Sequence, residues 1–290
     1  MAVLAALPIL LIAEPLTALH RRGIFLPGYG REAYDRIINI IVGPLFTVAV
    51  VASIAITARY LDRRPLADFG LTFDRHGWRS LALGLILGAA LMLLIFAAEY
   101  VSGMLVVTGF VVRNLAGVGL GLALIFSLVK VLCVGVYEEC FSRGYLLRNL
   151  ADGINLPAAV ILTSAIFALL HATNDNASVM STLGLFVNGL LFAAAVLATG
   201  RLSAAIGLHI SWNLFEGVVL GFPVSGDKEG ASLIGIHQLG PPIVTGGAFG
   251  PEAGVIGIAA SLLGIVALLV VSSDAYRPFS RGWSDRAGLR

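Results

Sequence analysis

The chain has 290 residues, of which 58% are hydrophobic and 12% are charged, and its formal net charge is +2. Soluble domains carry about 25% charged residues, so half of that content cannot cover a surface that faces water. The composition therefore predicts a polytopic membrane protein. The small net charge excludes a nucleic-acid-binding protein, which would need a basic stripe.

Eight apolar segments follow one another, each close to the roughly 20 residues that a membrane-spanning helix needs. The first is the weakest, because Pro8, Glu14 and Pro15 interrupt it. The fourth is expected to continue as one helix to about Leu150. The pattern predicts an all-α fold, a polytopic membrane helix bundle of about eight transmembrane helices, in a single transmembrane domain over residues 1–290. The segments cover residues 2–19, 37–59, 80–98, 115–137, 156–172, 178–199, 202–221 and 252–272.

The connections between these segments contain polar residues and helix breakers. The connector 62–79 mixes basic side chains with apolar ones such as Phe69, and it is expected to lie on the membrane surface. A tight helix–helix turn is expected at Gly153. The Gly- and Pro-rich stretch 222–251 is predicted to be the longest loop.

Lysine and arginine are distributed unevenly between the two faces of the predicted bundle. If all eight segments cross, one face collects Arg59, Arg63, Arg64, Arg75, Arg79, Arg143, Arg148, Arg201 and the four arginines of the C-terminal tail, against Arg21, Arg22, Arg31, Arg36, Arg113 and Lys228 on the other. The cytoplasmic side of membrane proteins is the one richer in these residues. We therefore expect an integral multi-pass protein, in the cell (inner) membrane if it is bacterial, with cytoplasmic termini and residues 273–290 as a cytoplasmic tail.

Two adjacent carboxylates, Glu138 and Glu139, lie at membrane depth at the end of the fourth apolar run. Ionisable groups are costly there unless they are paired or hydrated, so a chain that keeps both is expected to use them. Glu139 and Arg143 are spaced i,i+4, which lets them face each other on a helix and neutralise each other. Glu138 is then left without a partner on its own helix and is available as a general base.

Later segments carry two further pairs with a spacing of four. Phe167 and His171 place an aromatic ring one turn before an imidazole, which can accept or pass a proton. His209 and Asn213 place an imidazole and an amide on one helix face, where both can donate hydrogen bonds to an oxygen that becomes negatively charged.

Counting helical rise from the turn at Gly153 tests whether these groups can meet. With 1.5 Å per residue, Glu138 and His171 come within one turn of the same depth. The same count leaves His209 and Asn213 about 9–15 Å from His171 in depth. The first pairing is therefore predicted from the spacing, and the second is not.

Each motif also has a purely structural interpretation. The two glutamates with their arginine form an ion-pair cluster in some membrane bundles, and His171 alone could be a hydrogen-bonded packing residue. His209 with Asn213 could join two helices through hydrogen bonds. The presence of all three motifs in one hydrophobic half of the chain favours a functional site over packing alone.

In this order, the three motifs resemble those of the CPBP (ABI) family of intramembrane proteases, which includes the eukaryotic type II CAAX prenyl endopeptidases. Here they read Glu138-Glu139-Cys-Phe-Ser-Arg143, Phe167-Ala-Leu-Leu-His171 and His209-Ile-Ser-Trp-Asn213. The resemblance covers residues 115–221, the predicted catalytic core, and the flanks are similar only in their hydrophobicity. Many relatives have an aromatic residue directly before the arginine, where this chain has Ser142; that difference bears on helix packing.

The resemblance implies an intramembrane protease, a CAAX-type endopeptidase. Glu138, with His171, would position and deprotonate the attacking water. His209 and Asn213 would stabilise the oxyanion of the tetrahedral intermediate. The neighbouring glutamate, paired with Arg143, would hold the site in shape.

A zinc ion is the alternative way to activate the water. If a metal is bound, Glu138, His171 and His209 are the residues that could hold it. The chain lacks the His-Glu-x-x-His spacing that fixes two ligands on one helix, and the amide of Asn213 suits an oxyanion hole better than a ligand shell. We therefore expect no cofactor and favour the metal-independent glutamate mechanism over the zinc one.

Two functions of different classes follow from these residues. The first is an intramembrane endopeptidase that opens to the cytoplasm and cuts a membrane-associated, for example prenylated CAAX-type, protein or peptide. The second is a non-catalytic membrane scaffold or bacteriocin-immunity-type protein that binds a peptide in the same cavity. A secondary transporter is disfavoured because the hydropathy shows no repeats. The expected partners are the lipid bilayer and a membrane-associated peptide or protein, with no nucleic acid.

Overall fold

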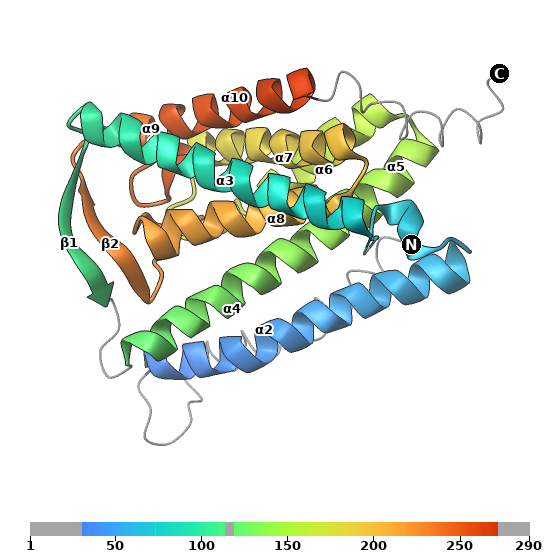
Figure 1. Ribbon diagram of the computed structural model, residues 1–290, viewed down its shortest axis with the longest axis horizontal. Helices are drawn as coiled ribbons and strands as arrows, with labels where there is room; N and C mark the ends of the chain where they lie inside the picture. The colour runs from blue at the N-terminus through green and yellow to red at the C-terminus, as the bar shows by residue number, and fades with distance from the viewer. Residues whose placement is uncertain (1–30, 73, 114–118, 272–290) are drawn as a thin grey trace.

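The computed structural model describes residues 31–72, 74–113 and 119–271. They form a bundle of helices with a two-stranded sheet at one end (Figure 1). The predicted membrane helix bundle is thereby confirmed for this part of the chain. The expected segment 2–19 and the tail 273–290 lie outside the described residues.

Five helical segments of the described chain are long and apolar enough to cross a membrane. They are Val42–Leu61, Arg75–Val101, Leu120–Gly153, Val179–Thr199 and Leu202–Val219, and two shorter apolar helices accompany them. The helices are α2 (Arg31–Ile56), α3 (Arg75–Val101), α4 (Leu120–Glu139), α5 (Leu147–Gly153), α6 (Leu156–Leu170), α7 (Val179–Thr199), α8 (Leu202–Asn213), α9 (Pro242–Thr245) and α10 (Val255–Val271). Wider π-helical turns extend α2 over Thr57–Leu61 and α8 over Leu214–Val219, and short 3₁₀ turns cover Leu66–Phe69 and Pro251–Ala253.

The predicted continuation of the fourth segment is confirmed. A π-helical turn over Cys140–Leu146 joins α4 to α5, so that one helical span of 34 residues runs from Leu120 to Gly153. The expected tight turn follows, because the side chain of Asn155 accepts a hydrogen bond from the Ala158 N–H at 2.9 Å and starts α6. The π-helical turn begins directly after Glu139, and π turns of this kind are common at functional sites.

The sheet was not predicted. Strand β1 (Leu105–Arg113) pairs antiparallel with β2 (Ala231–Gln238), from Leu105 opposite Gln238 to Arg113 opposite Ala231. The prediction of a plain loop over 222–251 is therefore wrong for β2 and for the short helix α9. The strand residues alone could not show this, because the ladder that stabilises β2 comes from a partner more than a hundred residues earlier.

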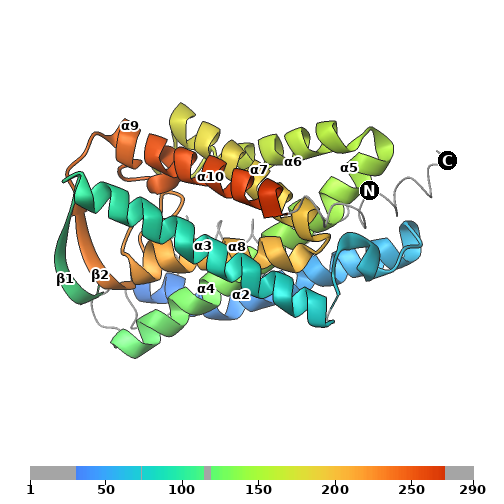
Figure 2. The same ribbon diagram turned by 45° about the horizontal axis from the view of Figure 1, so that its top comes forward.

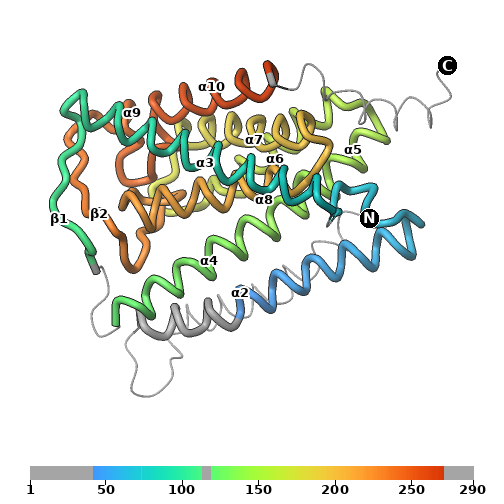
Figure 3. The backbone as a smooth tube through the Cα atoms, in the orientation of Figure 1, coloured from blue at the N-terminus to red at the C-terminus, as the bar shows by residue number. Residues whose placement is uncertain are grey.

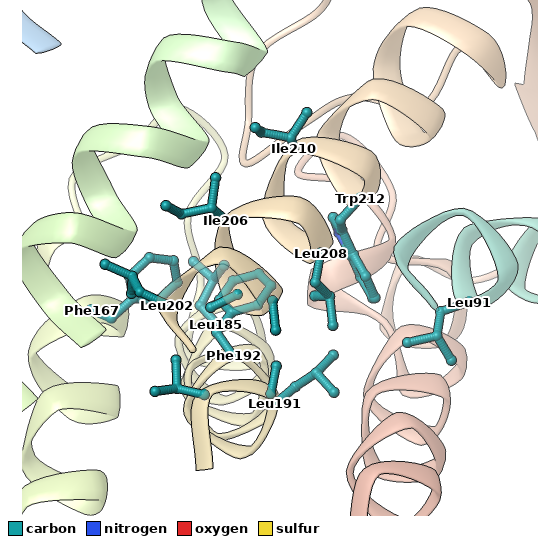
Figure 4. Close-up of a cluster of buried hydrophobic side chains, with 14 of the residues drawn as sticks. Leu91, Phe167, Leu185, Leu191, Phe192, Leu202, Ile206, Leu208, Ile210 and Trp212 are labelled. Carbon is teal, nitrogen blue, oxygen red and sulfur yellow. The ribbon is translucent and has the colours of Figure 1, made fainter. Parts of the chain in front are cut away.

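Helices α3 and α8 pack closely through glycines. A β-carbon at Gly88 would lie 2.6 Å from the carbonyl oxygen of Leu208, and one at Gly84 would overlap the carbonyl oxygen of Ala204. Figure 4 shows Leu91 of α3 in one apolar cluster with Leu208 and Trp212 of α8. Close approach of this kind lets helices associate in lipid by van der Waals contact.

The connector 62–79, expected to lie on the membrane surface, also packs against the protein. The ring of Phe69 is buried and stacks on Tyr145, with 5.6 Å between the ring centroids. The guanidinium of Arg64 pairs with the carboxylate of Asp152, next to the end of α5. The connector is therefore fastened to the protein, because it finds an aromatic partner and an ion-pair partner there.

The bundle has two ends with different chemistry, and both views place the sheet at the same one (Figures 1 and 2). We call the end that carries β1, β2 and residues 171–178 and 220–254 the sheet end. The opposite end, which carries residues 57–79, 148–155 and 199–202, is called the arginine end. Helix α4 runs between the two ends and obliquely to α8 (Figure 3).

Candidate active site

Glu138, His171 and His209 meet near the centre of the bundle, although they come from three different helical segments. Glu138 Oε2 lies 3.9 Å from Nε2 of His171 and 4.0 Å from Nε2 of His209. The hydroxyl of Tyr137 donates to the other oxygen, Oε1, at 3.2 Å. The carboxylate therefore keeps one oxygen directed at the two imidazoles.

Glu139 has different partners from Glu138. Its Oε1 accepts a hydrogen bond from Nη1 of Arg143 at 3.1 Å, and both side chains are fully buried. The same oxygen lies 2.8 Å from Nδ1 of His209. Because an ionised carboxylate can only accept, His209 donates from Nδ1. The spacing predicted the pair with Arg143, and the structure adds the histidine.

Arg143 makes a hydrogen bond and two aromatic contacts, which fix its position at the inner end of the site. Its Nη2 donates to the carbonyl of Gly189 on α7 at 3.2 Å. Its guanidinium lies over the ring of Phe167, 4.4 Å from the centroid, and 5.2 Å from that of Phe192. Cation–π contacts of this kind stabilise a desolvated guanidinium.

The two imidazoles are oriented by their other ring nitrogens. His171 follows the last residue of α6, and its Nδ1 lies 2.8 Å from the carbonyl oxygen of Phe167. A carbonyl only accepts, so Nδ1 carries a proton, and Nε2 faces Glu138. The ring of Phe192 stacks on His209, with centroids 4.7 Å apart and an angle of 11°. Both rings are thus fixed by contacts within the protein.

A cavity of about 190 Å³ connects these groups. Glu138, His171, His209 and Asn213 all line it, so the four residues expected to act on the substrate share one space. Asn213 lies one helical turn after His209 and is mostly buried. The cavity is large enough for part of a peptide and for water.

The depth count was wrong for His209 and Asn213. It assumed that α6 and α7 meet at one level, yet Phe192 packs on Phe167 at 6.0 Å between centroids. Phe192 lies about 20 Å along α7, whereas Phe167 is within one turn of the end of α6. Residues 171–178 therefore cover much of this difference in height, which brings α8 to the level of Glu138.

Several cavity residues come from loops and were missed by the motif analysis. The sheet-end loops contribute Asn174, Ser225, Asp227, Glu229 and Glu252, and α4 adds Lys130. The cavity therefore extends beyond the residues 115–221 that were expected to form the catalytic core. The single acidic residue at the start of the last apolar segment, Glu252, was the one signal in the sequence.

Glu252 faces a second buried carboxyl group. Its two oxygens accept hydrogen bonds from Ser225, at 3.0 Å from the N–H and 2.9 Å from the hydroxyl. A β-carbon at Gly250 would lie 3.0 Å from Glu216 Oε1 and 3.1 Å from Glu252 Oε2, so both carboxyl groups converge there. Glu216 is fully buried.

The residues do not fit a zinc ion as they are placed. Tetrahedral ligands at about 2.0–2.1 Å from zinc lie about 3.3 Å from one another. The atoms of Glu138, His171 and His209 are separated by 3.9 and 4.0 Å. Among the described residues, no group of three histidine, cysteine or acidic side chains has the spacing of a metal site.

The comparison with known families agrees with the motifs. Residues 120–215 match the family model described as type II CAAX prenyl endopeptidase Rce1-like. This family implies a protease that is embedded in a membrane and acts on a peptide or protein. No curated protein sequence matches the chain. The match contains all seven residues that define the three motifs, and residues 120–215 are therefore similar to the Rce1-like type II CAAX prenyl endopeptidase domain.

Proposed function

We propose that the chain is an intramembrane endopeptidase that hydrolyses a peptide bond of a membrane-associated protein or peptide. The observation that carries this proposal is the position of Glu138 Oε2, about 4 Å from two imidazole nitrogens inside one cavity. Hydrogen-bonded oxygen and nitrogen atoms lie about 2.8 Å apart, so one water molecule can bridge such a gap.

Glu138 and His171 are the groups that would activate this water. Nε2 of His171 and Oε2 of Glu138 both accept hydrogen bonds, so together they orient the two O–H bonds. As the water oxygen bonds to the scissile carbonyl carbon, its proton passes to Glu138. When the carbon–nitrogen bond breaks, the nitrogen takes up that proton and leaves as an amine.

His209 and Asn213 would stabilise the carbonyl oxygen as it becomes negative. To donate from Nε2 while Nδ1 donates to Glu139, His209 must carry both ring protons. The buried cluster then holds two carboxylates, one guanidinium and one imidazolium, and its charges cancel. This balance is what a water-poor site requires, because an uncompensated buried charge is costly. Preorganised donors of this kind are among the largest contributions to catalysis.

The experiment that tests the proposed function uses Glu138→Gln to trap the substrate in native membranes. The amide keeps the shape of the side chain and cannot take the proton, so uncleaved peptides should accumulate on the variant and be identified by mass spectrometry. Glu99→Gln is the matched control, because Glu99 is another buried glutamate and bonds Gln238 at 2.9 Å, away from the cavity. Recovery of the same peptides from both variants would contradict the proposal.

A further inference from the structure

The cavity opens toward the sheet end. The exposure of its charged side chains rises in this direction, from 17% for Glu138 to 35% for Lys130 and 69% for Asp227. Lys130 and Glu138 lie on the same helix, about 12 Å apart along its axis. The mouth of the cavity is therefore at Asp227, and Glu138 lies at its inner end.

The other side of the site is closed by protein. The side chains of Glu139 and Arg143 are fully buried directly behind Glu138. The rings of Phe167 and Phe192, also buried, pack against Arg143 from the same side. A peptide coming from the arginine end would have to displace this cluster, so the sheet end is the route to Glu138.

The site lies near the middle of the membrane. Trp78 and Tyr100, both more than half exposed, mark the two ends of α3, and about 33 Å of helix separates them. This matches the hydrocarbon thickness of about 30 Å, with aromatic side chains at both interfaces. Gly88, which packs on Leu208 beside His209, lies about 15 Å from Trp78. The mouth therefore decides from which aqueous side the site is reached.

The arginine end carries most of the positive charge of the described chain. Contacts tie its loops together: Arg64 pairs with Asp152, and Arg201 pairs with Asp74 at 3.0 Å. Helix α10 runs toward this end, and four more arginines follow it in the sequence (Figure 1). This end has Arg59, Arg63, Arg64, Arg75, Arg79, Arg148 and Arg201, whereas the opposite membrane face has Arg31, Arg36, Arg113 and Lys228. The arginine end is thus the cytoplasmic one by the positive-inside rule.

We propose that the cavity opens on the non-cytoplasmic side of the membrane and that its substrate is a membrane-anchored peptide segment presented on that side. The direction of the mouth follows from the fold and the charge distribution, and that a peptide is cut there rests on the proposed function. In this fold, a cytoplasmic arginine end and a cytoplasmic opening exclude each other. The inference replaces the expected cytoplasmic opening and argues against a cytoplasmic prenylated tail as the substrate.

Cysteine labelling tests the orientation without any need for catalysis. Cys133 and Cys140 are replaced by alanine, and single cysteines are introduced by Thr173→Cys at the sheet end and Ala67→Cys at the arginine end. Both positions are exposed and uncharged, so the substitutions leave the distribution of positive charge unchanged. The variants are expressed in the inner membrane of a bacterial host, and spheroplasts are treated with a membrane-impermeant maleimide.

We expect the Thr173→Cys variant to be labelled in intact spheroplasts and the Ala67→Cys variant only after the membrane is permeabilised. The reverse pattern, or labelling of both variants in intact spheroplasts, would overturn the inference. Trapping by Glu138→Gln then separates the two claims: expected labelling without any trapped peptide would contradict the proposed function and leave the orientation standing. Trapped segments that all lie on the cytoplasmic side would contradict the assignment of the substrate.

Discussion

Glu138 and Glu139 are neighbours with the same side chain, and the structure gives them different surroundings. Glu139 is enclosed between Arg143 and His209 and has no exposed surface. Glu138 accepts one hydrogen bond from Tyr137 and turns its other oxygen toward the cavity. A base must reach the proton that it removes. Because only Glu138 has an oxygen that faces the cavity, we assign the role of general base to Glu138 and the supporting role to Glu139.

Asn213→Ala tests the oxyanion role at the scale of a single residue. Removing one donor to the developing oxyanion costs about 10²–10³-fold in kcat in proteases, so we expect a loss of this order with KM little changed. Asn149→Ala is the control, because Asn149 lies in α5, outside the residues that line the cavity. Equal kcat values for the two variants in a peptide-cleavage assay would remove Asn213 from the mechanism.

The sequence predicts residue pairs along one helix better than pairs between helices. The spacing of Glu139 and Arg143 was sufficient, because i,i+4 fixes the contact. The contact between Glu139 and His209 joins residues seventy positions apart, and no local pattern indicates it. Glu252 was missed for the same reason, since its role depends on loops that fold back over the cavity.

Among the helices, the contact between α3 and α8 matters most for the site, because α8 carries His209 and Asn213. Gly84 and Gly88 let the two backbones approach. Gly84→Ala places a methyl group against the carbonyl oxygen of Ala204, and overpacking typically costs about 1–3 kcal/mol. We expect the midpoint of thermal unfolding in detergent to fall by several degrees.

The matched control for this prediction is Gly121→Ala in α4. A β-carbon there meets nothing within 4 Å, so only the helix propensity changes, in favour of alanine. Its melting temperature should be unchanged or slightly higher. If the two variants had the same melting temperature, close packing of α3 on α8 would not be a source of stability.

The elements that are long and apolar could be predicted, and the short ones could not. The span over Leu120–Gly153 was expected from its apolar run and the following helical spacing. Strands β1 and β2 were not, because neither strand is stable alone and their register is set by each other. The difference in depth between the end of α6 and the start of α7, which residues 171–178 cover, was not predicted. A count of helical rise gives distances along helices only and contains no information about the direction of a loop.

At the scale of the whole molecule, the cavity connects the buried polar site around Glu138 to the aqueous phase at the sheet end. Apolar helices surround Glu138, and the loops of the sheet end line the outer part of its cavity. The stretch 222–251, whose role the sequence left open, supplies part of the cavity lining through Val224, Ser225, Asp227 and Glu229. Catalysis and access are thus contributed by different parts of the chain.

The central claim is that Glu138 activates the water that cleaves the peptide bond. It is tested most directly by the cleavage rate of purified protein in liposomes with a metal chelator present, using a peptide identified by trapping. We predict that the wild-type protein and Glu99→Gln cleave at similar rates and that Glu138→Gln is slower by about 10²–10⁴-fold, the usual contribution of a general base. Cleavage by Glu138→Gln at the wild-type rate would contradict the account.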